Sequence, residues 1–203
     1  MSRYFTKTLA SLEPYTPGEQ LKIADIVKLN ANENPYPPAP GVAAAVAAAV
    51  PGLRLYSDLT NGDLNAAIAR HWGVRPENIL CGNGSDENLL LALRAFCDEN
   101  TPLAFADVTY SFYTVLCDLL HIPQHVIPLE SGLTIDLKEY CGLHETIVIA
   151  NPNAPTSLLA PVDAIEEVLK TNPDNIVIVD ETYVEFAPAG SSCLPLLETY
   201  DNL

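Results

Sequence analysis

The feature that most restricts the fold of this chain is a run of four apolar, β-favouring residues (176–179, Ile-Val-Ile-Val) that leads directly into Asp180-Glu181-Thr182-Tyr183. An apolar run of this length, bounded by polar residues, predicts a strand that is buried on both faces. In open α/β sheets, ligands bind at the carboxyl ends of the strands. We therefore expect Asp180 to stand at the mouth of a sheet, where it meets a positive or proton-bearing atom of a ligand.

Two other interpretations of this stretch remain. Asp180 could cap the following segment or accept hydrogen bonds within a loop. A hydrophobic strand ending in Asp-Glu is also typical of the magnesium-binding strand of P-loop ATPases. That class requires a G-x-x-x-x-G-K-[ST] loop, and the chain contains no Gly-Lys pair, so this interpretation is weak.

Composition and charge argue against several classes of protein. The chain has 203 residues, 48% of them hydrophobic, and a formal net charge of −16. This length predicts one sizeable folded domain, or one domain and part of another. The negative charge argues against binding to nucleic acid or to an anionic membrane surface. Five scattered cysteines without a C-x-x-C pair, and an N-terminus without an apolar signal region, predict no metal site and a cytoplasmic location.

Predicted strands and helices alternate along most of the chain. Because prolines block regular structure, we expect residues 1–38 to form an extended N-terminal arm and residues 39–203 to form the domain. Apolar spacing predicts helices near 41–50, 62–72, 86–97, 109–120, from Pro161 and near 194–199, and strands near 79–81, 102–106, 124–128, 146–150 and 176–179. This alternation implies an α/β fold in which helices cover both faces of a mainly parallel sheet, a three-layer α/β/α arrangement.

The first of three unusual loops is Gly82-Asn83-Gly84-Ser85, between a predicted strand and a helix. Glycine backbone N–H groups and a helix N-terminus favour an anion there. The loop departs from the dinucleotide fingerprint G-x-G-x-x-G because Glu87 occupies the third glycine position. The alternative is a plain helix cap by Ser85, with Asp86 and Glu87 in the first turn. Those two acids would repel a phosphate unless their side chains point away.

The other two loops add an aromatic ring and amides. Tyr110, at the start of a predicted helix, offers a flat face for stacking, although such a residue is more often part of the core. Residues 151–156 (Asn-Pro-Asn-Ala-Pro-Thr) form either a rigid surface turn or a stiff loop whose amides meet a ligand. An anion site, a ring, an amide and a buried carboxylate together suit pyridoxal phosphate, because a carboxylate beside its pyridine nitrogen keeps the ring electron-accepting.

An ordered set of motifs carries a family resemblance: Leu29-Asn30-Ala31-Asn32-Glu33-Asn34-Pro35, Leu55-Tyr56-Ser57-Asp58, Gly84-Ser85-Asp86-Glu87, Tyr110, Pro152-Asn153-Ala154-Pro155-Thr156 and Asp180-Glu181-Thr182-Tyr183. With these motifs, nearly the whole chain resembles the fold-type I pyridoxal-phosphate aminotransferases, and most closely the histidinol-phosphate aminotransferases. The resemblance implies that residues 39–203 are part of a cofactor-binding large domain. It also implies a homodimer whose substrates are a small-molecule amino donor and a 2-oxo acid.

The resemblance implies roles for individual residues. Ser85 and Asp86 would bind the cofactor phosphate, largely through the backbone, and Tyr110 would stack on the pyridine ring. Asp180 would pair with the ring nitrogen, and Tyr183 would hydrogen-bond the phenolic oxygen.

Two further positions are expected to touch the cofactor. Tyr56 would reach across the dimer to the partner subunit's cofactor phosphate. The family motif Asn-Pro-Thr-Gly usually provides an amide to the phenolic oxygen, but Ala154 stands at that position and Ser157 replaces the glycine. Neighbouring Asn153 could supply the missing amide.

The Schiff-base lysine of the family has no counterpart in this chain. The resemblance places it after a segment like residues 199–203, so we expect it beyond Leu203, together with a phosphate-binding arginine and a C-terminal small domain. The five lysines present lie in none of the site loops: Lys7, Lys22, Lys28, Lys138 and Lys170. The chain is therefore expected to lack a catalytic residue and to be inactive alone.

The activity that the resemblance implies is transfer of an amino group between histidinol phosphate and 2-oxoglutarate, in histidine biosynthesis. A related chemistry on the same fold, such as an aromatic aminotransferase or a threonine-phosphate decarboxylase, is one alternative. A non-catalytic module that binds a partner or a small ligand is another.

Overall fold

The computed structural model describes residues 3–12, 19, 21–23 and 25–203, in two compact units. One unit consists of Met1–Pro14 with Cys81–Leu203, and the other of Tyr15–Leu80. The predicted arm, residues 1–38, lies partly outside the described residues. Its described part includes a short helix, α1 (Lys7–Ser11), so this stretch is not entirely extended.

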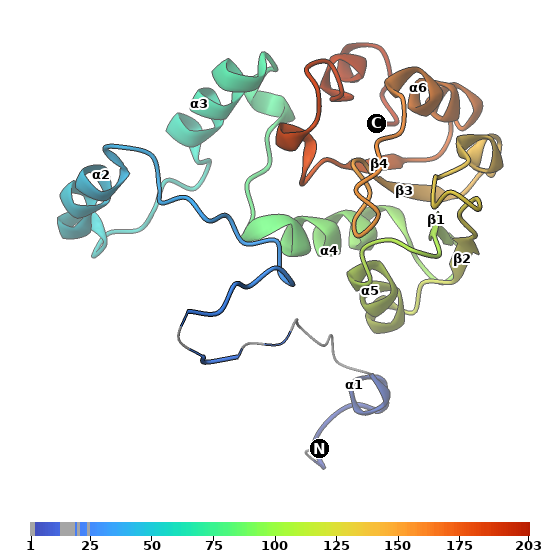
Figure 1. Ribbon diagram of the computed structural model, residues 1–203, viewed down its shortest axis with the longest axis horizontal. Helices are drawn as coiled ribbons and strands as arrows, with labels where there is room; N and C mark the ends of the chain where they lie inside the picture. The colour runs from blue at the N-terminus through green and yellow to red at the C-terminus, as the bar shows by residue number, and fades with distance from the viewer. Residues whose placement is uncertain (1–2, 13–18, 20, 24) are drawn as a thin grey trace. The chain divides into compact units, whose positions relative to one another are not determined.

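The larger unit is built on four strands and three longer helices (Figure 1). Its elements are α4 (Gly84–Phe96), β1 (Leu103–Ala106), α5 (Phe112–Leu120), β2 (Gln124–Ile127), η3 (Leu137–Tyr140), β3 (Thr146–Ala150), α6 (Val162–Thr171), β4 (Val177–Asp180), η4 (Val184–Phe186) and η5 (Leu194–Glu198).

The four strands form one parallel sheet in the order β2-β1-β3-β4. Ala150, the last residue of β3, is paired with Asp180, the last residue of β4. The carboxyl ends of the strands therefore lie at one edge of the sheet, and the predicted parallel sheet is confirmed.

Two hydrophobic clusters pack on opposite faces of this sheet. In β3, Ile147 and Ile149 join a cluster with Ile165 and Leu169 of α6. Val148, between them in sequence, joins the other cluster, with Leu89 and Leu93 of α4 and Tyr113 and Leu116 of α5. Side chains of a strand point alternately to opposite faces, so β3 is covered on both sides. The sheet lies between α6 on one face and α4 and α5 on the other, which is the predicted α/β/α arrangement.

Two of the expected strands also differ from the structure. Residues 79–81 were expected to form a strand, but no strand of the described chain pairs with them and Leu80 is largely exposed. β4 was expected to be buried on both faces, yet only Val177 is buried and Ile178 and Val179 are half-buried. β4 lies at the end of the sheet and pairs with β3 alone. An edge strand keeps part of its surface open, so its side chains are only partly buried.

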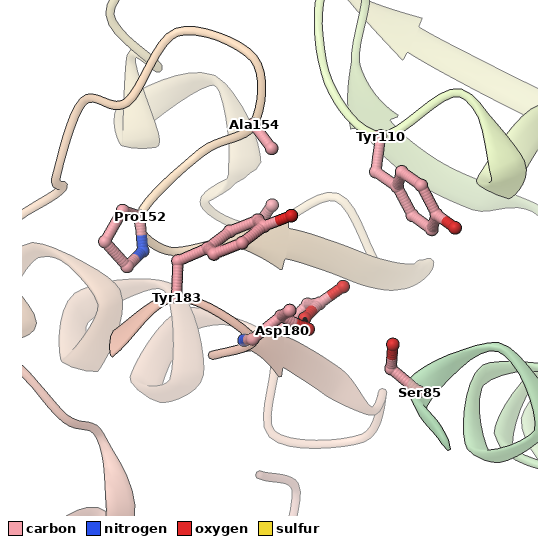
Figure 2. A pocket seen from close by; sticks show the side chains of 8 residues that line it. Ser85, Tyr110, Pro152, Ala154, Asp180 and Tyr183 are labelled. Carbon is pink, nitrogen blue, oxygen red and sulfur yellow. Dashed lines mark hydrogen bonds between the residues drawn. The ribbon is translucent and has the colours of Figure 1, made fainter. Parts of the chain in front are cut away.

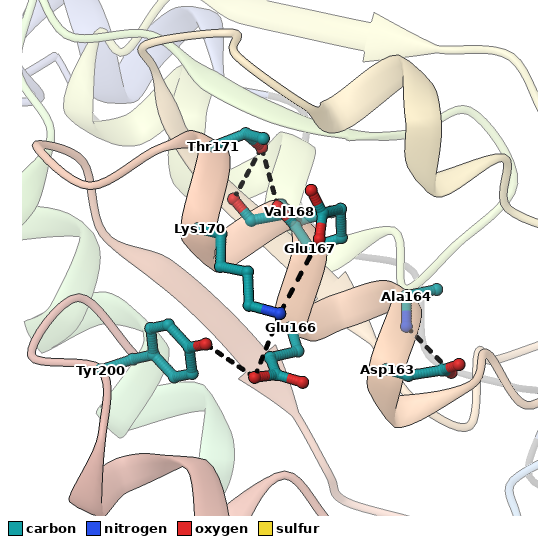
Figure 3. Close-up of polar contacts among 8 residues, drawn as sticks. All are labelled: Asp163, Ala164, Glu166, Glu167, Val168, Lys170, Thr171 and Tyr200. Atoms are coloured by element: carbon teal, nitrogen blue, oxygen red, sulfur yellow. Dashed lines mark hydrogen bonds and ion pairs between the residues drawn. The ribbon is translucent and has the colours of Figure 1, made fainter.

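The end of the described chain is attached to α6 and β4. The Tyr200 hydroxyl donates to the Glu166 carboxylate at 2.6 Å, and Lys170 lies 3.3 Å from the same oxygen (Figure 3). The Asn202 amide donates to the carbonyl oxygens of Leu169 and Asn172, at 3.1 and 2.9 Å. These contacts hold the Asn202 backbone carbonyl where it accepts a hydrogen bond from the N–H of Val177 on the outer side of β4.

The smaller unit is helical and contains α2 (Val42–Ala49), η1 (Val50–Gly52), α3 (Gly62–Trp72) and η2 (Pro76–Asn78). Before α3, the Asp58 carboxylate accepts hydrogen bonds from the backbone N–H groups of Thr60 and Gly62, at 3.0 and 2.7 Å. These bonds, first of all that from Thr60, lower the pKa of Asp58. In neither unit does a described helix have the length and apolar character of a membrane-spanning segment.

Candidate functional site

A pocket lies at the carboxyl edge of the sheet (Figure 2). The residues that line it come from the start of α4 and from the segments that end β3 and follow β1 and β4: Ser85, Tyr110, Ala150, Pro152, Ala154, Asp180, Thr182 and Tyr183. Tyr183 and Asp180 face Tyr110 and Ser85 across the opening (Figure 2). The pocket thus brings together residues from all three of the unusual loops.

Asp180 is the acid of this pocket, and its carboxylate is held by neighbouring donors. The backbone N–H and the hydroxyl of Thr182 both donate to Oδ1, at 3.1 and 2.6 Å. The hydroxyl of Tyr113 donates to Oδ2 at 2.8 Å. The backbone of β4 fixes Asp180 as well, because its carbonyl accepts from the N–H of Asn151 at 2.9 Å. The carboxylate is therefore held in one orientation at the end of a strand.

The start of α4 differs from the helix cap that the sequence allowed. Helix α4 begins at Gly84, and Asn83 is its N-cap residue, without a side-chain cap bond. Ser85 therefore lies inside the first turn, where its side chain lines the pocket, and the interpretation of Ser85 as the cap is wrong. Gly84 has φ +80°, a conformation that glycine adopts without strain.

The two acids of the first turn of α4 both accept hydrogen bonds from the protein. The Asp86 carboxylate accepts from the Tyr110 hydroxyl at 2.9 Å. The Glu87 carboxylate accepts a hydrogen bond from the backbone N–H of Asn83, the N-cap residue. Both carboxylates are therefore engaged by other groups of the protein, as is required if an anion is to bind beside them.

Tyr110 is half-buried, and aromatic neighbours support its ring. Its ring centroid lies 5.7 Å from that of Tyr113, at an interplanar angle of 88°. The centroid of Phe112 lies 6.0 Å away. An edge-to-face contact of this kind is favourable for aromatic pairs and keeps the Tyr110 ring in place at the pocket wall.

Asn153 does not line the pocket. Its side chain is buried and joins two loops: Oδ1 accepts from the Thr109 hydroxyl at 2.7 Å, and Nδ2 donates to the Val108 carbonyl and to the Thr156 hydroxyl, at 2.9 and 3.0 Å. Both amide protons are therefore used within the protein. Ala154, the residue that replaces the family's asparagine, lines the pocket instead. The contact between the Asn153 amide and a cofactor stays a prediction.

Tyr56 belongs to the smaller unit and has a fully exposed side chain. Its predicted action on a partner subunit stays a prediction.

His121 and His125 are four residues apart in sequence, but one caps the C-terminus of α5 and the other lies in β2. In the described part of the chain, no group of three or more His, Cys, Asp or Glu residues could hold a metal ion. The described residues that line the pocket include no lysine and no arginine.

Sequence reasoning missed Thr182 and Tyr113. Thr182 had a local signal: the carboxylate of an aspartate commonly accepts a hydrogen bond from the backbone N–H two residues later, in an Asx-turn. Tyr113 had a weaker signal: it follows Tyr110 by three positions at the start of a helix. Its partner Asp180 is 67 positions away, and no local pattern connects them.

Parallel strands between helical layers, with an acid, an aromatic ring and a helix N-terminus at the carboxyl edge, are typical of an α/β domain that binds a ligand at the ends of its strands. The chain belongs to the family of class I and II aminotransferases, whose family model matches residues 24–203.

Curated relatives match along the whole chain. It is 45% identical, over 208 residues, to histidinol-phosphate aminotransferase 2 of Dechloromonas aromatica (strain RCB), covering 100% of this chain and 58% of that protein. It is also 45% identical to histidinol-phosphate aminotransferase 1 of Bradyrhizobium diazoefficiens, covering 100% of this chain and 57% of that protein. The chain thus spans a little under three fifths of the length of these relatives.

Solved structures show the same fold. Histidinol-phosphate aminotransferase from Sinorhizobium meliloti, solved in complex with pyridoxal-5'-phosphate, superimposes with a TM-score of 0.78 at 24% identity, covering 94% of this chain and 54% of that one. An aminotransferase from Mycobacterium tuberculosis gives a TM-score of 0.71 at 25% identity, covering 82% of this chain and 47% of that one.

Proposed function

We propose that the whole protein is a pyridoxal-phosphate-dependent aminotransferase that transfers an amino group between histidinol phosphate and a 2-oxo acid, 2-oxoglutarate. Residues 39–203 would form part of its cofactor-binding domain. Family membership and the names of the relatives support this proposal. The observation that carries it is the Asp180 carboxylate, fixed at the end of β4 and facing an aromatic ring and the start of a helix.

The residues of the pocket fit this cofactor. A negative carboxylate at Asp180 suits a protonated pyridine nitrogen, since an opposite charge stabilises the protonated form. The Tyr110 ring offers a stacking face, and the Tyr183 hydroxyl can meet the phenolic oxygen. The backbone N–H groups at the start of α4, with Ser85, would bind the phosphate. When bound, pyridoxal phosphate supplies an electron-accepting ring that stabilises negative charge on the substrate carbon next to the amine.

The test is a binding and activity measurement on the protein expressed from its full gene. Purified protein without cofactor should bind pyridoxal phosphate with a change in absorbance, and Asp180→Asn should raise the dissociation constant at least roughly tenfold. The amide keeps the shape of the carboxylate and removes its charge. An Asp180→Asn variant that binds and turns over like the wild type would remove the basis of the proposal.

The substrate needs its own comparison. Histidinol phosphate, an aromatic amino acid and threonine phosphate should be offered separately to the enzyme, with 2-oxoglutarate as acceptor. We expect histidinol phosphate to give the highest kcat/KM. Preference for an aromatic amino acid, or release of carbon dioxide from threonine phosphate, would point to a related enzyme of the same fold.

A binding module without catalysis is the second candidate. The observation in its favour is that the described pocket residues include no lysine. Reading the gene beyond the codon for Leu203 distinguishes the two. A Ser-Lys pair followed by an arginine supports the aminotransferase, and a stop codon there supports the module.

The homodimer and the cytoplasmic location also stay proposals. Helix α2 is entirely apolar in sequence and buries none of its residues, as expected of a surface that a second subunit covers. If Tyr56 serves the partner's cofactor, dimers that combine a Tyr56→Phe subunit with an Asp180→Asn subunit should contain one intact site. Co-expression of the two impaired variants should then restore part of the activity. No restoration in isolated mixed dimers would argue against action in trans.

A further inference from the structure

Tyr113 is a buried residue that belongs to two parts of the site at once. It is the second residue of α5 and has no exposed surface. Its hydroxyl donates to Asp180 Oδ2 at 2.8 Å, and its ring packs edge-to-face against the ring of Tyr110. It does not line the pocket itself. Asp180 and Tyr110, which do, belong to segments at the ends of different strands, and Tyr113 contacts both of them.

The donors around Asp180 determine where a ligand can bind. An ionised carboxylate has about four acceptor positions, two on each oxygen. The N–H and the hydroxyl of Thr182 use the two positions of Oδ1. Tyr113 uses one position of Oδ2. Among the described residues no further donor reaches this carboxylate, so a single acceptor position, on Oδ2, remains for a ligand.

We propose that Tyr113 is a positioning residue: it fixes which lone pair of Asp180 meets the ring nitrogen of the cofactor, and it sets the plane of the Tyr110 ring that stacks on the same cofactor. This inference rests on the proposed function. It adds that the carboxylate and the stacking ring are aligned with each other through one buried side chain. Tyr113 acts through Asp180 and Tyr110 and does not itself touch the ligand.

The chemistry of the hydroxyl suits this role. Burial, followed by the neighbouring charge of Asp180, raises the pKa of Tyr113 above its ordinary value of 10.0. The phenol therefore keeps its proton and remains a donor. A hydrogen bond to a carboxylate stabilises the charged form of that carboxylate. Tyr113 would therefore help Asp180 to hold a proton on the ring nitrogen of a bound cofactor, which supplies the electron-accepting ring.

The decisive variant is Tyr113→Phe in the protein expressed from its full gene, because it removes the hydroxyl and keeps the ring. The main readout is the nitrogen-15 resonance of pyridoxal phosphate labelled at the ring nitrogen. We expect this resonance to move toward the frequency of an unprotonated ring, and kcat to fall roughly tenfold while KM changes less than about twofold. Tyr113→Leu also removes the ring that supports Tyr110, and should in addition weaken cofactor binding.

Tyr140→Phe is the matched control. Tyr140 is also fully buried, but in the hydrophobic cluster on the other face of the sheet. The same loss of a hydroxyl there should leave the nitrogen resonance and kcat unchanged, even if it changes thermal stability. If Tyr113→Phe does not fold, Tyr113→3-fluorotyrosine replaces it: a stronger donor should move the resonance in the opposite direction.

The outcomes separate this inference from the proposed function. A wild-type protein that binds no pyridoxal phosphate overturns both. If the wild type binds pyridoxal phosphate but Tyr113→Phe keeps the nitrogen resonance and kcat of the wild type, only the role of Tyr113 is overturned. Equal effects of Tyr113→Phe and Tyr140→Phe would identify Tyr113 as a packing residue and likewise overturn its role.

Discussion

The Tyr110 hydroxyl donates a hydrogen bond to the carboxylate of Asp86 at 2.9 Å, so the aromatic wall of the pocket is tied to the helix that begins beside it. This contact does two things. It orients the Tyr110 ring, and it engages an acid that lies in the first turn of α4, where an anion would bind. A helix N-terminus attracts a phosphate through its N–H groups, and a nearby carboxylate opposes that attraction unless it is occupied elsewhere.

We predict that Tyr110→Phe weakens binding of pyridoxal phosphate by roughly three- to tenfold. The ring remains for stacking, but the Asp86 carboxylate loses its donor and is free to turn toward the phosphate. Combining Tyr110→Phe with Asp86→Asn should bring the dissociation constant back to within about twofold of the wild type, since the like charge is gone. Fluorescence titration measures both constants. Weak binding that persists in the double variant would mean that the Asp86 charge is not the cause.

Ser157 gives a prediction about stability. It has φ +61°, the left-handed region that favours glycine, and it replaces the glycine of the family motif. Ser157→Gly should raise the free energy of unfolding by roughly 0.5–1 kcal/mol, because relief of backbone strain exceeds the entropy that glycine loses on folding. Ser157→Val should lower it by at least about 1 kcal/mol.

Urea denaturation of the Ser157 variants tests this, with Ser131→Gly as the matched control. Ser131 is also exposed and lies in a turn, but its φ is not in the left-handed region. Glycine there should lower stability by a few tenths of a kcal/mol. A Ser157→Gly variant less stable than the wild type would contradict the strain argument.

The buried thiols predict a loss of stability in alkaline solution. Burial raises the pKa of Cys117 and of Cys193 from the ordinary value of 9.0 to about 12. Below pH 9 both thiols are protonated in the folded and in the unfolded chain, and their contribution is intact. As the pH rises from 9 toward 12, the unfolded chain ionises first and binds fewer protons, so the free energy of unfolding falls. The expected loss is on the order of 1 kcal/mol per thiol between pH 9 and 10.

Urea midpoints at pH 8 and pH 10, under reducing conditions, measure this loss. Cys193→Ala should show a smaller difference between the two pH values than the wild type, whatever its absolute stability. Other groups that titrate in this range, such as tyrosines, are present in both proteins and cancel in the comparison. An unchanged difference would show that Cys193 ionises equally in the folded and unfolded states.

The chain of residues 1–203 alone should show no turnover with histidinol phosphate, because no lysine lines the described pocket. Treatment with pyridoxal phosphate and borohydride, followed by peptide mass spectrometry, tests this directly. Any lysine that is labelled should be labelled equally in an Asp180→Asn chain, as expected for reaction at the surface. One lysine labelled to completion, and only when Asp180 is intact, would reveal an amine at the site.

Much of the fold follows from local patterns in the sequence. The alternation of apolar runs predicts the strands and helices of the larger unit, and the alternating burial of Ile147, Val148 and Ile149 reflects the two covered faces of a parallel sheet. Local patterns do not predict strand order. The position of β4 at the sheet edge, and the partial exposure of Ile178 that follows from it, depend on pairing between distant segments.

The site shows the same division. The acid at the end of β4 and the aromatic ring after β1 could be predicted, because each follows a strand of a parallel sheet and such ends meet. The loop before α4 also lines the pocket, although the strand expected before it is absent from the sheet. The direction in which each side chain points could not. Asn153 has the chemistry of a ligand-binding amide, but its hydrogen bonds to Thr109 and Val108 hold its side chain in the protein interior. Only the folded chain decides between such competing partners.

The pocket has residues from segments as distant in sequence as Ser85 and Tyr183, which meet only when the sheet has formed. An unfolded chain therefore offers no binding site, and any ligand of this pocket adds its binding free energy to folding. A ligand at a hundred times its dissociation constant contributes about 2.7 kcal/mol, a sizeable share of the stability of a typical domain. The supply of that small molecule in a cell would then govern how long the protein survives, because proteases and aggregation act on the unfolded population.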